Sequence, residues 1–420
     1  MRVALVHDFL IECGGAERVL EALHEIWPKA PLFTAFYDPK SLGGQAKRFK
    51  NWKIITSWGT RLPFWKQLVS PYRIFAKSFF ESFDLSKFDL VISSSSMYMA
   101  KAVKVPNGVH ICYCHTPPRF LYGYPTAYQW RRNPVIRVIG EIINHFMRVW
   151  DFEVSQPPSR KATDGQEEPA RRSLGEGRVD YFIANSREVQ RRIKKFYRRE
   201  SKVIYPPVDV SRFARMTTKA RRLTQKAALS VKHSALSNYF LVVSRLVAAK
   251  KVDIAVEVYA KLGLPLKVVG TGRELQALQK LADESRIKNQ ESGIEFLGDV
   301  EDRELVELYQ NCRAVIFPAA QEDFGLVPVE AMAAGRPVIA CAQGGVLESV
   351  IDWSVGGKGK CTGVYFDPPT GGSLTLAINN FFDLEKRGFF DPKFIRHHAQ
   401  KFSKERFKRE ILKFVEEKLK

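Results

Sequence analysis

The sequence has few features of a disulfide-rich, metal-binding or membrane-spanning protein. Its 420 residues include only six cysteines, and these are scattered, with neither a C-x2-C pair nor a His/Cys ligand spacing. We therefore expect reduced, buried cysteines rather than disulfides or a metal site. No uncharged apolar run reaches the roughly 18 residues that a transmembrane helix needs. His7 and Asp8 soon interrupt the first apolar stretch, so we also expect no signal peptide.

Acidic residues are too few to balance the basic ones, and the net charge is +21. Basic residues crowd Arg187–Lys202, Arg212–Lys232 and Lys386–Lys420. Such charge suits nucleic acid or an anionic membrane. The sequence has no helix-turn-helix, zinc-finger or RNP-type pattern. We therefore expect the protein to bind a membrane surface and not nucleic acid. If the protein is not an enzyme, the alternative is a basic nucleic-acid-binding protein.

The stretch Trp52–Phe83 favours the membrane. Aromatic and basic side chains that alternate in this way suit the boundary between lipid headgroups and water. The alternative is that the aromatic side chains pack into the core and the basic ones are simply solvated. The residues concerned are Trp52, Trp58, Phe64, Trp65, Tyr72, Phe75, Phe79 and Phe80, with Lys53, Arg61, Lys66, Arg73 and Lys77.

Apolar runs of strand length alternate with amphipathic helical segments, which predicts α/β domains with parallel sheets. The length favours two domains. Each should be doubly wound, with ligands at the carboxyl ends of the strands in a cleft between the domains. The predicted strands are 2–7, 90–93, 110–113 and 181–184 in the first domain, and 239–243, 266–269, 294–296, 314–317 and 337–340 in the second.

The predicted domain boundaries follow the composition. We assign residues 1–206 to the first domain, 207–237 to a linker with a basic insertion, and 238–403 to the second domain. Residues 155–178 are rich in Pro, Gly, Ser and charge, so we expect a disordered insertion there. An amphipathic helix should follow over 404–420.

Two glutamates bracket a predicted strand–loop–helix segment. Arg313–Pro318 has the pattern of a buried strand, and the helix that follows has Pro328 in its first turn and stops at Gly335. Glu322 then lies in the loop and Glu330 about two turns into the helix. Backbone amides near Phe324, Gly325 and Leu326 would face an anionic ligand. A phosphorylated sugar or ribose offers both an anion and hydroxyls for the two carboxylates.

These residues carry a resemblance. The run Glu322–Ala340, with Gly14-Gly15-Ala16-Glu17-Arg18-Val19 and His115-Thr116-Pro117-Pro118, resembles the retaining, nucleotide-sugar-dependent glycosyltransferases of family 4, which have the GT-B fold. The likeness covers nearly the whole chain except 155–178 and 216–237. Within the family, the sequence looks most like bacterial mannosyltransferases that build surface polysaccharides.

The resemblance implies roles on the donor side. Arg245 and Lys250 would hold the diphosphate, whose charge grows as the glycosidic bond breaks. Gly14 and Gly15 would let a backbone approach the phosphates. Glu322 would bind hydroxyls of the donor sugar, and Glu330 would bind the ribose hydroxyls. Val300 or its neighbours would border the base. The glycine pair Gly344-Gly345 is expected to be a plain turn, with a position near phosphate as the alternative.

His115 is the implied catalytic residue of the first domain, where it would contact the sugar or orient the acceptor; Asp8 and Arg119 are further acceptor-side candidates. No Asp-x-Asp pair occurs, so we expect no metal ion and no other cofactor. The implied activity is transfer of a sugar, with mannose from GDP-mannose favoured, to a lipid-linked or polysaccharide acceptor. A UDP-sugar donor and a soluble acceptor remain alternatives. We expect a cytoplasmic protein, peripheral on the inner face of the plasma membrane, with the 404–420 helix packed on the first domain.

Overall fold

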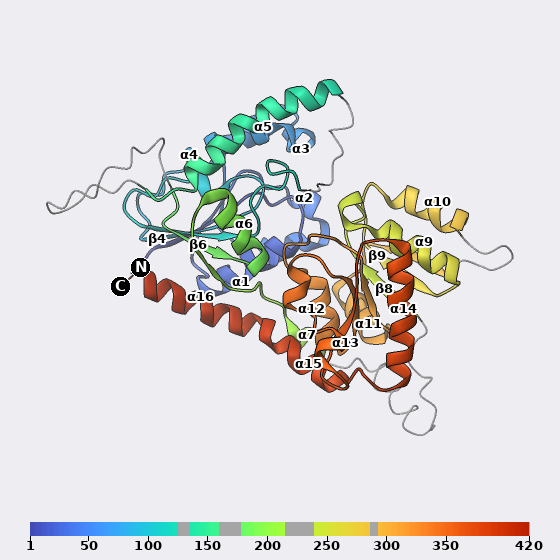
Figure 1. Ribbon diagram of the computed structural model, residues 1–420. Helices are drawn as coiled ribbons and strands as arrows, with labels where there is room; N and C mark the ends of the chain where they lie inside the picture. The colour runs from blue at the N-terminus through green and yellow to red at the C-terminus, as the bar shows by residue number, and fades with distance from the viewer. Residues whose placement is uncertain (125, 127–133, 159–177, 215–238, 286–292, 420) are drawn as a thin grey trace. The chain divides into compact units, whose positions relative to one another are not determined.

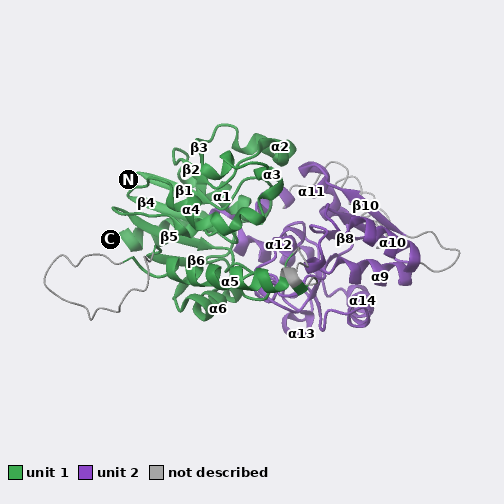
Figure 2. Ribbon diagram, turned by 90° about the horizontal axis from the view of Figure 1, so that it is seen from above, with its two compact units in different colours: residues 1–207, 407–420 green, residues 208–406 purple. Residues whose placement is uncertain are grey.

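The computed structural model describes residues 1–124, 126, 134–158, 178–214, 239–285 and 293–419 (Figure 1). The chain divides into two compact units, which Figure 2 colours separately. Unit 1 contains residues 1–207 and 407–420, and unit 2 contains residues 208–406. None of the described helices has the length and apolarity needed to cross a membrane.

Unit 1 is built on a seven-stranded sheet in the order β3-β2-β1-β4-β5-β6-β7, in which all neighbours are parallel. Its strands are β1 Val3–His7, β2 Leu32–Thr34, β3 Ile54–Thr56, β4 Leu90–Ser95, β5 Val109–Cys114, β6 Tyr181–Ala184 and β7 Ser201–Val203. Its α-helices are α1 Gly15–Ile26, α2 Pro39–Leu42, α3 Trp65–Leu68, α4 Ala76–Glu81, α5 Pro134–Val154 and α6 Arg187–Tyr197. Short 3-10 helices are η1 Gly43–Phe49, η2 Trp58–Arg61, η3 Pro71–Phe75 and η4 Ala100–Ala102.

Alternate residues of these strands feed the two faces of the sheet, as strand geometry requires. Leu5 packs in one cluster with Leu20 and Leu23 of α1, whereas Val6 packs in another with Phe79 of α4 and Met147 of α5. The C-terminal helix α16 (Lys404–Leu419) joins the first cluster through Phe407, Ile411, Phe414 and Val415. Helix α16 therefore covers the unit 1 sheet on the same face as α1.

Unit 2 has a six-stranded sheet in the order β10-β9-β8-β11-β12-β13, again parallel throughout. Its strands are β8 Phe240–Val243, β9 Leu266–Val269, β10 Ile294–Gly298, β11 Val315–Phe317, β12 Val338–Cys341 and β13 Gly363–Phe366. Its α-helices are α7 Val210–Ala214, α9 Val252–Leu262, α10 Leu275–Ser285, α11 Asp302–Asn311, α12 Leu326–Ala333, α13 Trp353–Gly356, α14 Gly371–Lys386 and α15 Pro392–Ala399. Its 3-10 helices are η6 Ala248–Lys250, η7 Gly345–Glu348 and η8 Gln400–Phe402.

In both units the strand order reverses beside the first strand of the sheet. Strand β1 lies between β2 and β4, and β8 lies between β9 and β11. At such a switch point the loops at the carboxyl ends of the strands diverge to opposite faces and leave room for a ligand. The loops after β1, β4, β8 and β11 are therefore where the topology favours binding.

The observed boundaries differ from the predicted ones at several points, and unit 2 extends to residue 406 rather than 403. Residues 208–214, which the sequence assigns to a linker, belong to unit 2, where Phe213 packs against the ring of Tyr309. Ser155 and Arg178, the predicted ends of an insertion, are buried, and Arg178 forms an ion pair with Glu81. The remaining insertion residues 159–177, and residues 215–238 beside the linker, lie outside the described part of the chain.

The aromatic–basic stretch Trp52–Phe83 does not form the continuous exposed surface that the sequence predicts. Phe79 and Phe80 are fully buried, Trp65 stacks on Phe36 with ring centroids 5.2 Å apart, and Trp58 packs on Phe79 at 4.8 Å. Phe64 is exposed. Among the cations, Lys66 pairs with Asp38, and Arg73 lies over the ring of Phe120 at 4.2 Å. Most of these side chains therefore contribute to the core of unit 1, as the alternative interpretation held.

Candidate functional site

Lys250 and Glu322, both predicted as site residues, meet in unit 2. Lys250 is the last residue of η6, after β8, and Glu322 lies in the loop between β11 and α12. The Lys250 Nζ donates a hydrogen bond of 2.6 Å to Oε2 of Glu322, and both side chains are about four-fifths buried. The switch point of the sheet thus brings a cation and a carboxylate together, as sequence spacing alone could not show.

Arg245 lies in the loop between β8 and η6, where its side chain is exposed. Backbone contacts with the loop after β9 fix this segment: the Leu246 amide donates to the Thr271 carbonyl across 2.8 Å. A Cβ on Gly270 would lie 1.9 Å from the Ser244 carbonyl oxygen, and one on Gly272 would lie 2.1 Å from that of Leu246. Both positions therefore require glycine, and the two loops hold the backbone of Arg245 in place.

The glycine pair Gly344-Gly345 does more than make a turn. The Gly345 amide donates to the Glu322 carbonyl across 2.8 Å, and Gly344 forms an isolated bridge with Glu322. Gly344 has a φ of +83°, and a Cβ there would lie 2.3 Å from the Glu322 carbonyl oxygen. A plain turn does not by itself account for the close approach of these two backbones, which positions the Glu322 loop.

Helix α12 begins beside Glu322. Its N-cap is Gly325, with a φ of +87°, and glycine offers no side chain to occupy the first-turn amides of Leu326 and Val327. These amides and the helix dipole favour an anion. Phe324 is buried, and its ring packs against Phe402 at 5.5 Å, so only its backbone is placed for a ligand.

Glu330 lies on α12 with only 2% of its surface exposed. Its Oε2 accepts a hydrogen bond of 2.7 Å from the hydroxyl of Tyr309, a residue of α11. The hydroxyl fixes the rotamer of the carboxylate, which is how a hydrogen-bonding residue is prepared for a ligand. Val300, the predicted neighbour of the base, follows β10 and is half-buried.

In unit 1, His115 belongs to a buried chain of polar side chains at the carboxyl ends of β1, β4 and β5. Its Nε2 lies 2.7 Å from Ser94 Oγ, which lies 3.0 Å from His7 Nδ1. His7 Nε2 is 3.2 Å from Oε1 of Glu17, whose Oε2 accepts from the Gly14 amide at 2.6 Å. We call Glu17, His7, Ser94 and His115 the unit 1 relay.

The hydrogen bonds of the relay restrict the tautomers of its histidines, which we assign here for neutral imidazoles. Burial opposes ionisation of Glu17, but hydrogen bonds from His7 and from the Gly14 amide lower its pKa below the ordinary value. An ionised carboxylate only accepts, so His7 Nε2 donates to it. With neutral imidazoles, His7 Nδ1 then accepts from the Ser94 hydroxyl, and Ser94 Oγ accepts from His115 Nε2. The remaining nitrogen of His115, Nδ1, is left as an acceptor.

His115 is neutral at physiological pH, because burial lowers its pKa to about 4. The Gly14 amide is already used by Glu17, and Gly15 is the first residue of α1. Asp8 accepts hydrogen bonds from Ser96 and from the amides of Met97, Tyr98 and Ala100. Asp8 therefore organises the loop after β4 rather than facing an acceptor, and Arg119 is half-buried in the loop after β5.

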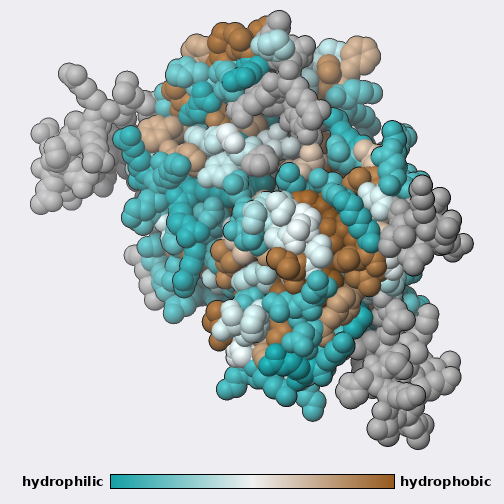
Figure 3. Space-filling view, turned by 45° about the vertical axis from the view of Figure 1, so that its right-hand side comes forward, coloured by the Kyte–Doolittle hydropathy of each residue, from teal (hydrophilic) through white to brown (hydrophobic). Residues whose placement is uncertain are grey.

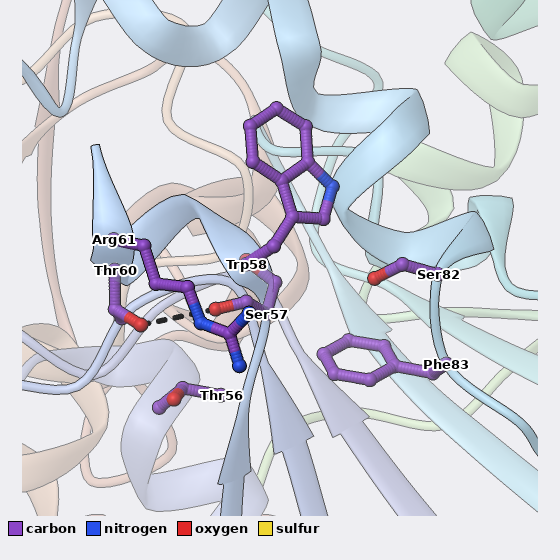
Figure 4. Close-up of a pocket in the computed structure, with 7 residues that line it drawn as sticks. All are labelled: Thr56, Ser57, Trp58, Thr60, Arg61, Ser82 and Phe83. Carbon is purple, nitrogen blue, oxygen red and sulfur yellow. Dashed lines mark hydrogen bonds between the residues drawn. The ribbon is translucent and has the colours of Figure 1, made fainter.

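A pocket of about 310 Å³ lies elsewhere in unit 1, at the end of β3 (Figure 4). Its wall includes Ser57, Trp58, Thr60, Arg61 and Ser82. The hydroxyls already donate to backbone carbonyls: Ser57 to Ala35, Thr60 to Ser57 and Ser82 to Phe79. With these donors engaged inside the unit, the polar groups that the pocket offers a ligand are chiefly Arg61 and the Thr56 hydroxyl, and the switch-point residues remain the candidate site.

Sequence reasoning missed Tyr309 and three members of the relay, His7, Ser94 and Glu17, as site residues. Tyr309 gives no signal, since an aromatic residue in an amphipathic helix is usually a core residue. The sequence did contain a signal for Ser94: the serine run 93–96 ends an otherwise apolar strand, and polar residues there commonly face a ligand.

Within the described parts of the chain, no three His, Cys, Asp or Glu side chains are grouped to hold a metal ion.

Comparison with known proteins finds glycosyltransferases among the proteins to which the chain is similar. The family model described as "Glycosyl transferases group 1" matches residues 229–391, a range that lies within unit 2. The D-inositol 3-phosphate glycosyltransferase of Kineococcus radiotolerans is 31% identical over 235 residues, 51% of this chain and 53% of that protein. The alpha-1,3/1,6-mannosyltransferase ALG2 of Dictyostelium discoideum is 36% identical over 87 residues, 21% of each.

Among solved structures, Anabaena Alr3699/HepE in complex with UDP-glucose matches 99% of this chain and 100% of its own, with a TM-score of 0.65 and 18% identity. This likeness shows the fold, which is the GT-B architecture of two Rossmann-like domains. The chain spans about half or less of the length of the curated relatives it matches.

Proposed function

We propose that this GT-B chain is a glycosyltransferase that moves a sugar from a nucleotide sugar to an acceptor, with the donor held in unit 2. The observation that carries the proposal is the contact of Lys250 with Glu322 at the switch point, beside the uncapped first turn of α12. A cation, first-turn amides and two carboxylates are the groups that a diphosphate, a sugar and a ribose need. The group 1 domain match over 229–391 supports the same assignment.

In the proposed reaction, the bond between the anomeric carbon and the diphosphate oxygen breaks, and the oxygen keeps the electron pair. Arg245 and Lys250 stabilise the growing negative charge on the phosphate. Glu322 holds sugar hydroxyls and offsets positive charge on the ring. The acceptor hydroxyl attacks from the face that the diphosphate leaves, and its proton passes to the departing phosphate oxygen. The configuration at the anomeric carbon is retained.

The Lys250–Glu322 ion pair also gives donor binding a sequence of events. Without a donor, the ammonium is neutralised by the carboxylate. A diphosphate carries more charge and competes for Lys250, which releases Glu322 toward the sugar hydroxyls. Diphosphate binding thus prepares the carboxylate for its role, and a donor fragment without phosphates should bind poorly.

We further propose GDP-mannose as the donor, because the resemblance is to family 4 mannosyltransferases and one matched relative is a mannosyltransferase. A UDP-sugar is the second candidate, since the structurally similar HepE was solved with UDP-glucose. We propose a lipid-linked or polysaccharide acceptor at the anionic inner face of the plasma membrane. The net charge of +21 supports that location.

Thermal unfolding of the full chain in the presence of GDP-, UDP- and ADP-sugars tests the donor assignment. A ligand that binds only the folded state raises the melting temperature, by an amount that grows with its concentration relative to its Kd. GDP-mannose should produce the largest rise. A comparable rise with every nucleotide, or with none, would contradict the assignment.

The same screen with and without a chelator tests metal independence. Arg245 and Lys250 supply the positive charge that a divalent ion supplies in other transferases, so the shift and the turnover should survive the chelator. Loss of turnover that magnesium restores would show that the reaction needs a metal ion.

A further inference from the structure

Helix α5 has its apolar side chains on the outside. Six large apolar residues of this helix are exposed, with exposed fractions from 38% to 61%. They are Val138, Ile139, Ile142, Ile143, Phe146 and Val149. Their spacing follows the helix period, so they share one side of α5, and we call them the α5 face. In Figure 3, brown apolar atoms gather along the upper edge of the molecule, the side on which Figure 1 draws α5.

Polar contacts hold the opposite side of α5 against unit 1. Asp151, fully buried, accepts hydrogen bonds from the Lys101 ammonium at 2.5 Å and from the Tyr122 hydroxyl at 2.8 Å. Arg148 donates to the Leu121 carbonyl at 3.0 Å. A buried carboxylate cannot turn outward without leaving the ammonium unpaired, which costs several kcal/mol. The helix is therefore locked with the α5 face pointing away from its own domain.

Single exposed apolar side chains are ordinary, but a contiguous set on one helix marks an interaction surface. The charge of the chain indicates the partner. On α5 itself, Arg137 and His145 are exposed, whereas Glu141 and Glu153 are half-buried and Glu141 pairs with Arg148. The whole chain carries a net charge of +21, which favours an anionic partner.

We propose that the α5 face docks on an anionic lipid surface, with the helix lying in the plane of the headgroups. A helix with an exposed apolar face on a cationic protein, neither long nor apolar enough to span, is suited to that position. Two chains that each carry a net charge of +21 repel one another, which disfavours a second copy of the chain as occupant. The proposed function, with its lipid-linked acceptor, supplies the reason for docking on a membrane. The α5 face itself is defined by exposure alone, without reference to catalysis.

Vesicle sedimentation of the full chain tests the proposal. The wild type should bind vesicles of phosphatidylcholine mixed with phosphatidylglycerol, and less tightly at high salt because screening weakens the attraction. Replacement of Ile139, Ile142 and Phe146 by Ser should weaken partitioning more than about tenfold, since three apolar side chains no longer enter the lipid. All three are exposed, so the fold should tolerate the change.

A matched variant controls for the loss of exposed apolar surface in general. Val355 and Leu376 of unit 2 are 84% and 72% exposed, and their replacement by Ser should leave vesicle binding unchanged. Nucleotide binding, measured on the same samples, should be equal in all three proteins, which separates this proposal from the assignment of the donor site. Vesicle binding that survives the triple replacement overturns the proposal. So does a lipid-free dimer that the triple replacement dissociates, because a second copy would then cover the face.

Discussion

The ammonium of Lys250 donates to the carboxylate of Glu322 across 2.6 Å, although 72 residues separate them in the chain. The contact joins the loop after β8 to the loop after β11, and both loops are fixed by backbone approaches at glycine. Because the two groups neutralise each other, a ligand that binds either one must compete with the other. The contact makes separate predictions for binding and for turnover.

Replacement of Glu322 by Gln should lower kcat far more than it changes nucleotide affinity. The carboxylate stabilises the positive charge that develops on the sugar ring in the transition state, so its loss should raise the activation free energy. It also competes with the diphosphate for Lys250, so the nucleoside diphosphate should bind the variant as tightly as the wild type or tighter. Steady-state kinetics and calorimetric titration measure the two effects. A loss of nucleotide affinity with unchanged kcat would place Glu322 on the nucleotide instead.

Replacement of Glu330 by Gln should weaken nucleotide binding itself, because a neutral amide holds ribose hydroxyls less strongly than a carboxylate. Replacement of Tyr309 by Phe should produce a smaller loss of the same kind, because it removes only the hydroxyl that orients the carboxylate. Titration with a 2′-deoxy nucleotide is the matched control. If Glu330 holds the ribose, both variants should lose less affinity for the deoxy ligand than for the parent.

The unit 1 relay predicts the tautomer of His115. Its Nε2 should carry the proton and its Nδ1 should not, which nitrogen-15 NMR of the imidazole distinguishes. Replacement of Ser94 by Ala removes the acceptor for Nε2 and should shift the His115 signals while those of His110 stay in place. Replacement of Ser93 by Ala is the counterpart, because Ser93 Oγ lies 2.8 Å from His110 Nε2. A proton on Nδ1 of His115 in the wild type would contradict the relay.

Buried histidines make the stability of the protein fall in acid. Burial lowers the pKa of His110 and of His115 from 6.5 to about 4. Between these values the unfolded chain binds protons that the folded chain does not, so the free energy of unfolding decreases as the pH falls. The decrease is about 1 kcal/mol per pH unit for each histidine. Denaturant unfolding at several pH values measures it.

His110→Gln should make that dependence on pH shallower, whereas the change of exposed His145 to Gln should not. A slope of opposite sign, with the wild type more stable at the acid end, would show that the two imidazoles are charged in the folded state.

The sequence predicted the parallel sheets and most of the long strands, because buried parallel strands are continuous apolar runs. Strands β2, β3 and β7 were not predicted, since three residues each are too short to show a pattern. The four-residue strand β13 was also missed. The sequence placed Arg245 and Lys250 after β8 and Glu322 after β11, as the structure has them. Their contacts were not foreseen, because the pairing depends on strand order and on the tight approaches at Gly270, Gly272 and Gly344.

The interacting surface was harder to predict. The alternation of Trp58, Phe64 and Trp65 with basic residues looks the same whether the rings face lipid or the core, and Trp58 and Trp65 pack inward. Helix α5 has the periodicity of an ordinary core helix. Which side faces out depends on the contact of Asp151 with Lys101, a pairing of residues 50 apart that no local pattern reveals.

The most direct test of the account is the affinity of the full chain for GDP-mannose before and after Arg245 and Lys250 are both replaced by Ala. Each contact of a cation with phosphate contributes about 1.5–3 kcal/mol, so the double variant should bind at least about a hundredfold more weakly. Lys280→Ala, which removes a cation that is 76% exposed on α10, should bind as the wild type does. If the double variant binds GDP-mannose as tightly as the wild type, the donor is not held in unit 2 as proposed.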